Sequence, residues 1–113
     1  MRLSHTQPLP DGTRVRVRLP QARDRAGLIA LHERLGAPLD DVRMARTLRF
    51  DPRERVSVCA TVLHGVSETL VAYGHVERDG SASLIVADEL FAPGVGDVVA
   101  AALAERAERQ HVA

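Results

Sequence analysis

The chain has no lysine and no tryptophan, and its 113 residues include only one tyrosine and two phenylalanines. Without lysine, neither a Schiff base nor a lysine general base can form on this chain. Surfaces that bind single-stranded nucleic acid usually stack the bases on aromatic side chains, which are scarce here. The formal net charge is zero, so general attraction to nucleic acid is not expected either.

Cysteine is also nearly absent. Cys59 is the single cysteine, which excludes a disulfide within the chain. It lies in an alternating apolar run and is expected to be a buried small hydrophobic residue; a catalytic thiol would need a thiolate-stabilising context that the sequence does not show. No His/Cys spacing predicts a metal site, and no serine-centred nucleophile motif is present.

Long hydrophobic runs are missing as well. No stretch approaches the length needed to span a membrane, and the start, Met1–Pro10, lacks the charged and then apolar pattern of a secretory signal. The cytoplasm is therefore the expected location, with no membrane partner. A length of 113 residues and an apolar content of 45% are those of one domain with a single modest core.

Charge is distributed unevenly along the chain. Residues 1–55 hold twelve arginines and seven acidic residues, whereas residues 56–113 hold three arginines and eight acidic residues. The two parts could attract each other or a second subunit, or they could simply form a solvated mixed surface.

Hydrophobic spacing predicts seven elements after a flexible N-terminal arm over residues 1–12, which contains two prolines and an Asp-Gly turn. The expected elements are a strand at 14–19, a helix from Asp24 to Leu35 stopped by Gly36, a helix capped by Asp40 or Asp41, strands at 55–63, 69–77 and 82–87, and a helix capped by Asp97. Residues 13–113 are thus predicted to form one α+β domain, in which three helices flank a mostly antiparallel sheet of about four strands. The order is β-α-α-β-β-β-α.

Two features of the first predicted strand and helix have alternative interpretations. Arg14, Arg16 and Arg18 share one strand face, which could bind phosphate or nucleic acid but is more typical of a solvated surface. His32 lies on the first predicted helix and is expected to be exposed or to face a partner.

A glycine loop links the strand at 82–87 to the last helix. Backbone amides at such a junction can converge on an anion, and the helix dipole assists them. The placement of Gly94-Val95-Gly96 therefore predicts a phosphate-bearing cofactor, although two glycines can also merely relax a tight turn.

This order of elements, with Arg16-Val17-Arg18-Leu19-Pro20 at the start and Gly94-Val95-Gly96 before the last helix, resembles the N-terminal two-thirds of the GNAT acetyltransferase superfamily. The resemblance covers roughly residues 13–110. It implies a three-layer GNAT-like fold and an acyl-CoA cofactor, acetyl-CoA in particular. The resemblance places the pantetheine arm and the pyrophosphate on Leu84, Ile85, Val86, Phe91, Gly94, Val95, Gly96, Asp97 and Val98.

The chain departs from the GNAT pattern at several positions. Phe91 stands where the family has Gln or Arg, Pro93 removes one amide from the loop, and Asp97 adds a negative charge beside the expected pyrophosphate. After the last helix the family continues with further strands and a helix, which commonly supply a tyrosine as general acid. The chain is accordingly identified as a C-terminally truncated or degenerate member that acts without this part, completes its site across a dimer, or does not catalyse.

Acetyl transfer would also need a group that takes a proton from the acceptor amine. His75 and Glu77 are two residues apart on one strand face, with Tyr73 on the same face, and are the candidate catalytic residues. Glu89 is a weaker candidate. The alternative is that this face is only the polar side of a sheet.

Two functions follow from the resemblance. The first is an acyl-CoA-dependent N-acetyltransferase-like protein that transfers acetyl to an amine. The second is a catalytically inactive GNAT-like module for binding or regulation, which acts through dimerisation or a protein partner. Since the strand at 82–87 would be an apolar sheet edge, we expect a second copy of the chain or its own N-terminal arm to cover it. Nucleic-acid binding is a third and less favoured alternative.

Overall fold

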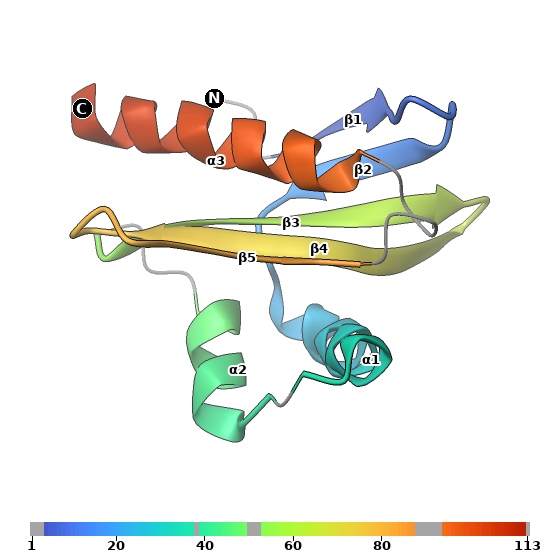
Figure 1. Ribbon diagram of the computed structural model, residues 1–113, viewed down its shortest axis with the longest axis horizontal. Helices are drawn as coiled ribbons and strands as arrows, with labels where there is room; N and C mark the ends of the chain where they lie inside the picture. The colour runs from blue at the N-terminus through green and yellow to red at the C-terminus, as the bar shows by residue number, and fades with distance from the viewer. Residues whose placement is uncertain (1–3, 38, 50–52, 88–93, 113) are drawn as a thin grey trace.

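The protein has three layers, a central sheet between two layers of helices. The computed structural model describes residues 4–37, 39–49, 53–87 and 94–112, with side chains up to residue 108. Helix α3 covers one face of the sheet, and α1 and α2 cover the other (Figure 1). None of the helices in these ranges is long and apolar enough to cross a membrane.

The sheet consists of antiparallel neighbours in sequence order, β1-β2-β3-β4-β5. The strands are β1 (Ser4–Pro8), β2 (Arg14–Arg18), β3 (Arg55–His64), β4 (Ser67–Glu77) and β5 (Ala82–Val86). The α-helices are α1 (Arg25–Leu35), α2 (Asp41–Leu48) and α3 (Val95–Val112), and a short 3-10 turn over Ala22–Asp24 precedes α1. The α+β class, the three helices and the antiparallel order are confirmed.

One strand was not predicted. Residues 4–8 form β1, so this part of the N-terminal region is not the expected flexible arm. The connecting turn is fixed by hydrogen bonds from Leu9 N to Thr13 O (2.7 Å) and from Gly12 N to Leu9 O (2.9 Å), and Leu9 is buried. Pro8 comes last in the strand, at the edge of the sheet, where its missing N–H is tolerated.

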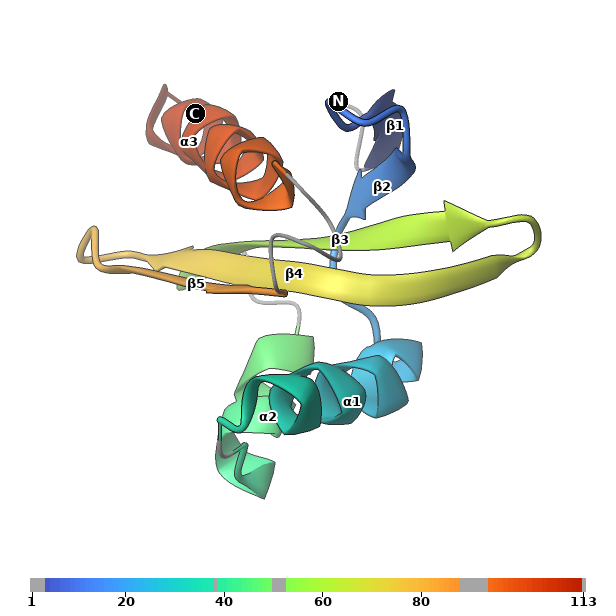
Figure 2. The same ribbon diagram turned by 45° about the vertical axis from the view of Figure 1, so that its right-hand side comes forward.

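β1 also corrects the expectation that the N-terminal arm could cover the apolar edge. It pairs with β2 from Ser4↔Arg18 to Pro8↔Arg14, at one edge of the sheet, whereas β5 forms the other edge. Figure 2 shows the β1–β2 hairpin beside α3, on the side of the sheet away from α1 and α2.

The ends of the first two helices follow the predicted chemistry. Gly36 takes a left-handed conformation (φ 66°) just after α1, where its lack of a Cβ removes the steric penalty. Asp40 caps α2 by accepting a hydrogen bond from Arg43 N at 2.7 Å. Asp24, by contrast, precedes α1 but its carboxylate makes no capping bond to that helix.

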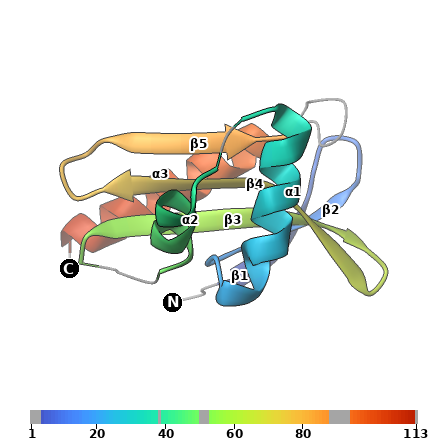
Figure 3. The same ribbon diagram turned by 90° about the horizontal axis from the view of Figure 1, so that it is seen from below.

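The long strand β4 shows how the two faces differ. Gly74 lies under α3, and a Cβ at this position would come within 2.9 Å of Leu103 Cδ1 and 2.8 Å of the Ser83 carbonyl oxygen. Tyr73, the preceding residue, points to the opposite face and contacts His32 of α1. Helix α1 crosses the sheet over β3 and β4 (Figure 3), so residues on both faces of these strands are buried.

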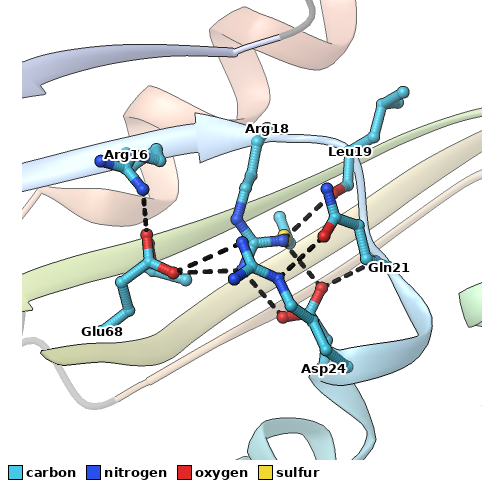
Figure 4. Close-up of polar contacts among 9 residues, drawn as sticks. Arg16, Arg18, Leu19, Gln21, Asp24 and Glu68 are labelled. Carbon is cyan, nitrogen blue, oxygen red and sulfur yellow. Dashed lines mark hydrogen bonds and ion pairs between the residues drawn. The ribbon is translucent and has the colours of Figure 1, made fainter.

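A buried ion pair joins the end of β2 to the start of α1. Arg18 donates through both terminal nitrogens to Asp24, each bond being 2.8 Å, and Gln21 N donates to the same carboxylate at 2.7 Å (Figure 4). The side chains of Arg18 and Asp24 are only 6% and 8% exposed. Arg18 is therefore not part of a solvated arginine face, as its position on an alternating strand had suggested.

The carboxylate of this pair is stabilised in its charged form. Burial raises the pKa of Asp24, but the hydrogen bonds from Arg18 and from the Gln21 amide outweigh it, so the pKa lies below its ordinary value. The same contact raises the pKa of Arg18. Both groups are thus fully charged near neutral pH.

We expect Asp24→Asn to destabilise the protein by about 3 kcal/mol at pH 7, since it leaves a buried guanidinium facing a neutral side chain. The contribution of Asp24 is present above the carboxyl pKa of the unfolded chain, about 4, and is lost as the pH falls through its lower folded pKa. Urea unfolding between pH 7 and pH 2.5 should show this loss in the wild type and a flatter profile in the variant. Asp40→Asn, at an exposed cap that asparagine also serves, is the matched control and should change little.

Gly74→Ala should destabilise the protein by about 1–3 kcal/mol, because its Cβ would collide with a carbonyl oxygen and with Leu103. Gly96→Ala is the control, since a Cβ there would make only ordinary contacts with Val86, at 3.6 and 3.7 Å, within helix α3. Alanine in a helix is favoured over glycine, so this variant should gain up to about 1 kcal/mol. Thermal unfolding of both variants measures the difference, and equal destabilisation would contradict the packing described for β4.

Candidate cofactor and catalytic site

The edge of β5 has backbone groups that no described residue uses. Ala87 N donates to Val71 O, and Glu77 N donates to Ser81 O, so in this antiparallel ladder the odd-numbered residues of β5 bond to β4. The N–H and C=O groups of Leu84 and Val86 therefore point away from β4. Ile85, the third predicted pantetheine contact on this strand, is opposite Tyr73 and bonds inward.

The helix that follows begins earlier than expected. Its first residue is Val95, so Asp97 lies within the first turn and is not the cap. Gly94 accepts a hydrogen bond from Val98 N at 3.3 Å, which occupies the amide of Val98. The amides of Val95, Gly96 and Asp97 have no acceptor among the described residues and remain available to an anion. Phe91, predicted as a cofactor contact, and Glu89 lie outside the described residues.

Different structural constraints act on the two glycines of the loop. Gly94 has φ 84°, and a Cβ at this position would lie 2.9 Å from Pro10 Cδ, so both its conformation and the approach of the β1–β2 turn favour glycine. Gly96 has no such constraint, because its nearest neighbour is Val86 at ordinary contact distance. Gly96 instead brings the start of α3 close to β5, with room for no more than a methyl group between its Cα and Val86.

The predicted catalytic face places His75, Glu77 and Tyr73 on the side of the sheet that carries α1 and α2. Glu77 lies 3.1 Å from Arg46 Nη2 and 3.6 Å from Arg55 Nε, and its Oε1 is 3.4 Å from His75 Nε2. Its carboxylate is thus already engaged by cations. His75 is opposite Ser83 of β5, one strand in from the open edge.

The imidazole of His75 is held in its neutral form. Burial lowers its pKa, and Arg55, Arg46 and Arg43 lower it further, while Glu77 opposes these effects only in part. A neutral imidazole near the β5 edge can accept a proton at neutral pH. Of the two predicted catalytic residues, His75 has the better-suited chemistry.

Tyr73 is occupied by a contact that the sequence did not predict. His32 is 3% exposed, contrary to the expected exposed position, and its Nε2 is hydrogen bonded to the Tyr73 hydroxyl. His32 Nδ1 is 3.1 Å from the Ala37 carbonyl, to which it can only donate, so in the neutral ring Nε2 accepts from Tyr73. Burial raises the pKa of Tyr73, which keeps the donating hydroxyl protonated. A helical histidine 41 residues away from a tyrosine gives no sequence signal for this pair.

Cys59 is buried, as expected from the sequence. Burial raises the pKa of its thiol to about 12, despite the neighbouring Arg18, whose Nη1 is 3.4 Å from the sulfur. The thiol form is therefore retained at neutral pH, and a thiolate nucleophile is not available here. Among the described residues, no group of three or more His, Cys, Asp or Glu side chains could hold a metal ion.

The comparisons with known proteins define the fold. No protein-family model matches the sequence, and no curated protein matches it. The structure is similar to the crystal structure of the GNAT domain of S. lividans PAT, with a TM-score of 0.75 and 20% sequence identity, over 96% of this chain and 73% of that chain. The chain therefore has the GNAT fold, which confirms the resemblance seen in its sequence.

Proposed function

We propose that this chain binds an acyl-CoA, acetyl-CoA in the first instance, and transfers the acetyl group to an amine. The observation that carries the proposal is the open edge of β5, which leads to the first turn of α3 within a GNAT fold. One ligand that offers amides to the strand edge and phosphates to the helix start would match both.

The residues present fit such a cofactor at both places. The outward N–H and C=O groups of Leu84 and Val86 can pair with the amide groups of a pantetheine arm, as an added strand would. The amides of Val95, Gly96 and Asp97 can donate to a phosphate, and Gly96 has no side chain to cover its own backbone. The exposed Asp97 carboxylate weakens the attraction for phosphate without blocking the amides.

Bound acetyl-CoA would supply an activated acetyl thioester. The chain's own contribution is to orient the arm along β5 and to remove the proton that the attacking amine loses. We assign this proton to His75 Nδ1, directly or through a water molecule, because Nε2 faces the Glu77 carboxylate and carries the proton of the neutral ring. Glu77, held by Arg46 and Arg55, then acts as a positioning residue whose carboxylate stabilises the imidazolium that forms.

His75→Gln should lower kcat for acetyl transfer at least tenfold and leave the affinity for acetyl-CoA unchanged. The rate of the wild type should rise with pH through the His75 pKa, which lies below 6.5, and this rise should disappear in the variant. Steady-state kinetics from pH 5 to pH 8 with a panel of amines gives both readouts. His5→Gln, on β1, is the control. An unchanged kcat in His75→Gln would remove His75 from the proposed mechanism.

The second candidate function is a non-catalytic GNAT-like module that pairs with a second copy through β5. The segment Ser83–Val86 is apolar and uncharged, and Leu84 is 40% exposed, so this edge is suited to strand addition. Pairing with a second copy and pairing with a pantetheine arm would use the same outward groups of Leu84 and Val86. The two functions therefore compete for one edge.

Leu84→Pro tests whether this edge is used. Proline removes the outward N–H and adds its ring to the open side, while the inward ladder of Ser83 and Ile85 is kept. We expect acetyl-CoA affinity to fall at least tenfold, whereas Leu84→Ala, which keeps the amide, should bind within about threefold of the wild type. Calorimetry measures the affinity, and circular dichroism checks that both variants fold.

Sizing with light scattering, with and without acetyl-CoA, separates the two functions. A monomer that binds acetyl-CoA supports the cofactor proposal, and a dimer lost in Leu84→Pro and insensitive to acetyl-CoA supports the module. Equal acetyl-CoA binding by the wild type and Leu84→Pro would reject the proposed cofactor edge. The cytoplasmic location and the absence of nucleic-acid binding stay predictions.

A further inference from the structure

A cavity lies away from the candidate cofactor site. Its volume is about 640 Å³, within the usual range for small-molecule pockets, and it lies between the start of α1, the face of β2 and the β3–β4 hairpin. None of its lining residues comes from β5 or from the start of α3. The acetyl-transfer proposal gives this cavity no role.

The charged lining of the cavity carries an excess of one positive charge. Three arginines, Arg16, Arg18 and Arg23, line it together with two carboxylates, Asp24 and Glu68. Asp24 is fully occupied by Arg18 and the Gln21 amide. The positive charge available at the cavity therefore depends on how the Glu68 carboxylate is shared among the three arginines.

Glu68 does not satisfy the arginines around it. Its Oε1 accepts from Arg16 at 2.7 Å and from Thr61 Oγ1 at 3.3 Å. Its Oε2 lies 3.7 Å from Arg18 Nη2 and 3.8 Å from Arg23 Nη2, both longer than a hydrogen bond. Figure 4 shows Glu68 between Arg16 and Arg18.

Two donor groups at this cavity have no hydrogen-bond acceptor among the described residues. Arg18 Nε has no partner but is buried out of reach of a ligand in the cavity. Arg23 bonds through Nε to Gln21 Oε1 at 2.8 Å, and its Nη2 is left with the long contact to Glu68. An anion in the cavity can therefore accept a charge-assisted hydrogen bond from Arg23 Nη2, which Glu68 engages only at 3.8 Å.

The rest of the lining is apolar or small. Leu63, Val66 and Leu70 contribute side chains, and Gly27 lets the start of α1 pack closely on Leu70, since a Cβ there would lie 3.1 Å from Leu70 Cβ. Val66 is fully exposed at the tip of the hairpin. The cavity thus joins a cationic region to an apolar wall.

We propose that this cavity is a binding site for a small organic monocarboxylate with a short alkyl chain. One negative charge matches the single excess positive charge, and a carboxylate oxygen can accept from Arg23 Nη2, which only the long contact to Glu68 holds. The alkyl chain packs against Leu63, Val66 and Leu70. The chain's formal net charge is zero, so anion binding at this place is a local property of the cavity.

Hexanoate is the probe, with hexanamide as its uncharged counterpart and inorganic phosphate as an anion without an alkyl chain. We expect NMR titration of the full chain to show saturable hexanoate binding, with shifts at Gly27, Leu63 and Leu70. Hexanamide and phosphate should bind at least tenfold more weakly, because each lacks one half of the match. No saturable hexanoate binding, or equal binding of hexanamide or of phosphate, would overturn the proposal.

Arg23→Gln removes the exposed arginine of the cavity and should weaken hexanoate binding at least fivefold. Its side chain is 60% exposed, so the fold should be unaffected. Arg14→Gln is the matched control, because Arg14 is an exposed residue of β2 that does not line the cavity, and its variant should bind like the wild type. Equal weakening in both variants would mean diffuse charge attraction and would reject the site. Acetyl-CoA binding should be unchanged in both, since this cavity shares no residue with the β5 edge.

Discussion

The buried pair of Arg18 and Asp24 is the interaction on which the two-sided architecture depends. A guanidinium that is almost wholly out of water needs a charged partner, and Asp24, in the turn that precedes α1, supplies it. The pair therefore fixes where α1 leaves the sheet. From there α1 crosses β3 and β4, which brings His32 onto Tyr73. A second polar contact between helix and sheet is thus aligned by the first.

The candidate cofactor site lies at the β5 edge of the sheet, whereas this pair lies near the β1 edge. β5 forms the edge there, and its outward backbone groups and the first amides of α3 need no buried charge to hold them. Gly94 accommodates the β1–β2 turn, whereas a side chain at Gly96 would make only ordinary contact with Val86. The pair that stabilises the fold and the residues proposed to contact a ligand are therefore different residues. Variants can change one without changing the other.

Much of the fold could be predicted from the sequence, because period-two alternation, the Asp79-Gly80 turn and the glycine stop at the end of α1 are local signals. β1 was missed, since an edge strand of polar residues that ends in proline carries no alternation of apolar residues. The positions of Leu84 to Val86 and of Gly94 to Val98 followed from the resemblance. Local sequence could not show that Val98 N is used within the helix, or which residues of β5 face outward.

The polar contacts were the least predictable part. The strand pattern suggested that Arg16 and Arg18 both face water, but Arg18 is buried in its pair with Asp24, whereas Arg16, bonded to the distant Glu68, remains 41% exposed. Glu68 is 50 residues from Arg18 in the chain, and His32 is 41 residues from Tyr73. Such pairs depend on how the layers pack, and that packing is set by the core as a whole.

The two edges of the sheet also differ in a way that limits how large an assembly can grow. Both edge strands have five residues, but β1 is polar and ends at Pro8, whereas β5 is mostly apolar and uncharged. Strand addition between two β5 edges would use up both apolar edges and leave only β1 edges outside, which are poor templates for a further chain. Such a contact closes on itself about a two-fold axis, so the same unprotected strand that can join two copies cannot propagate a fibre.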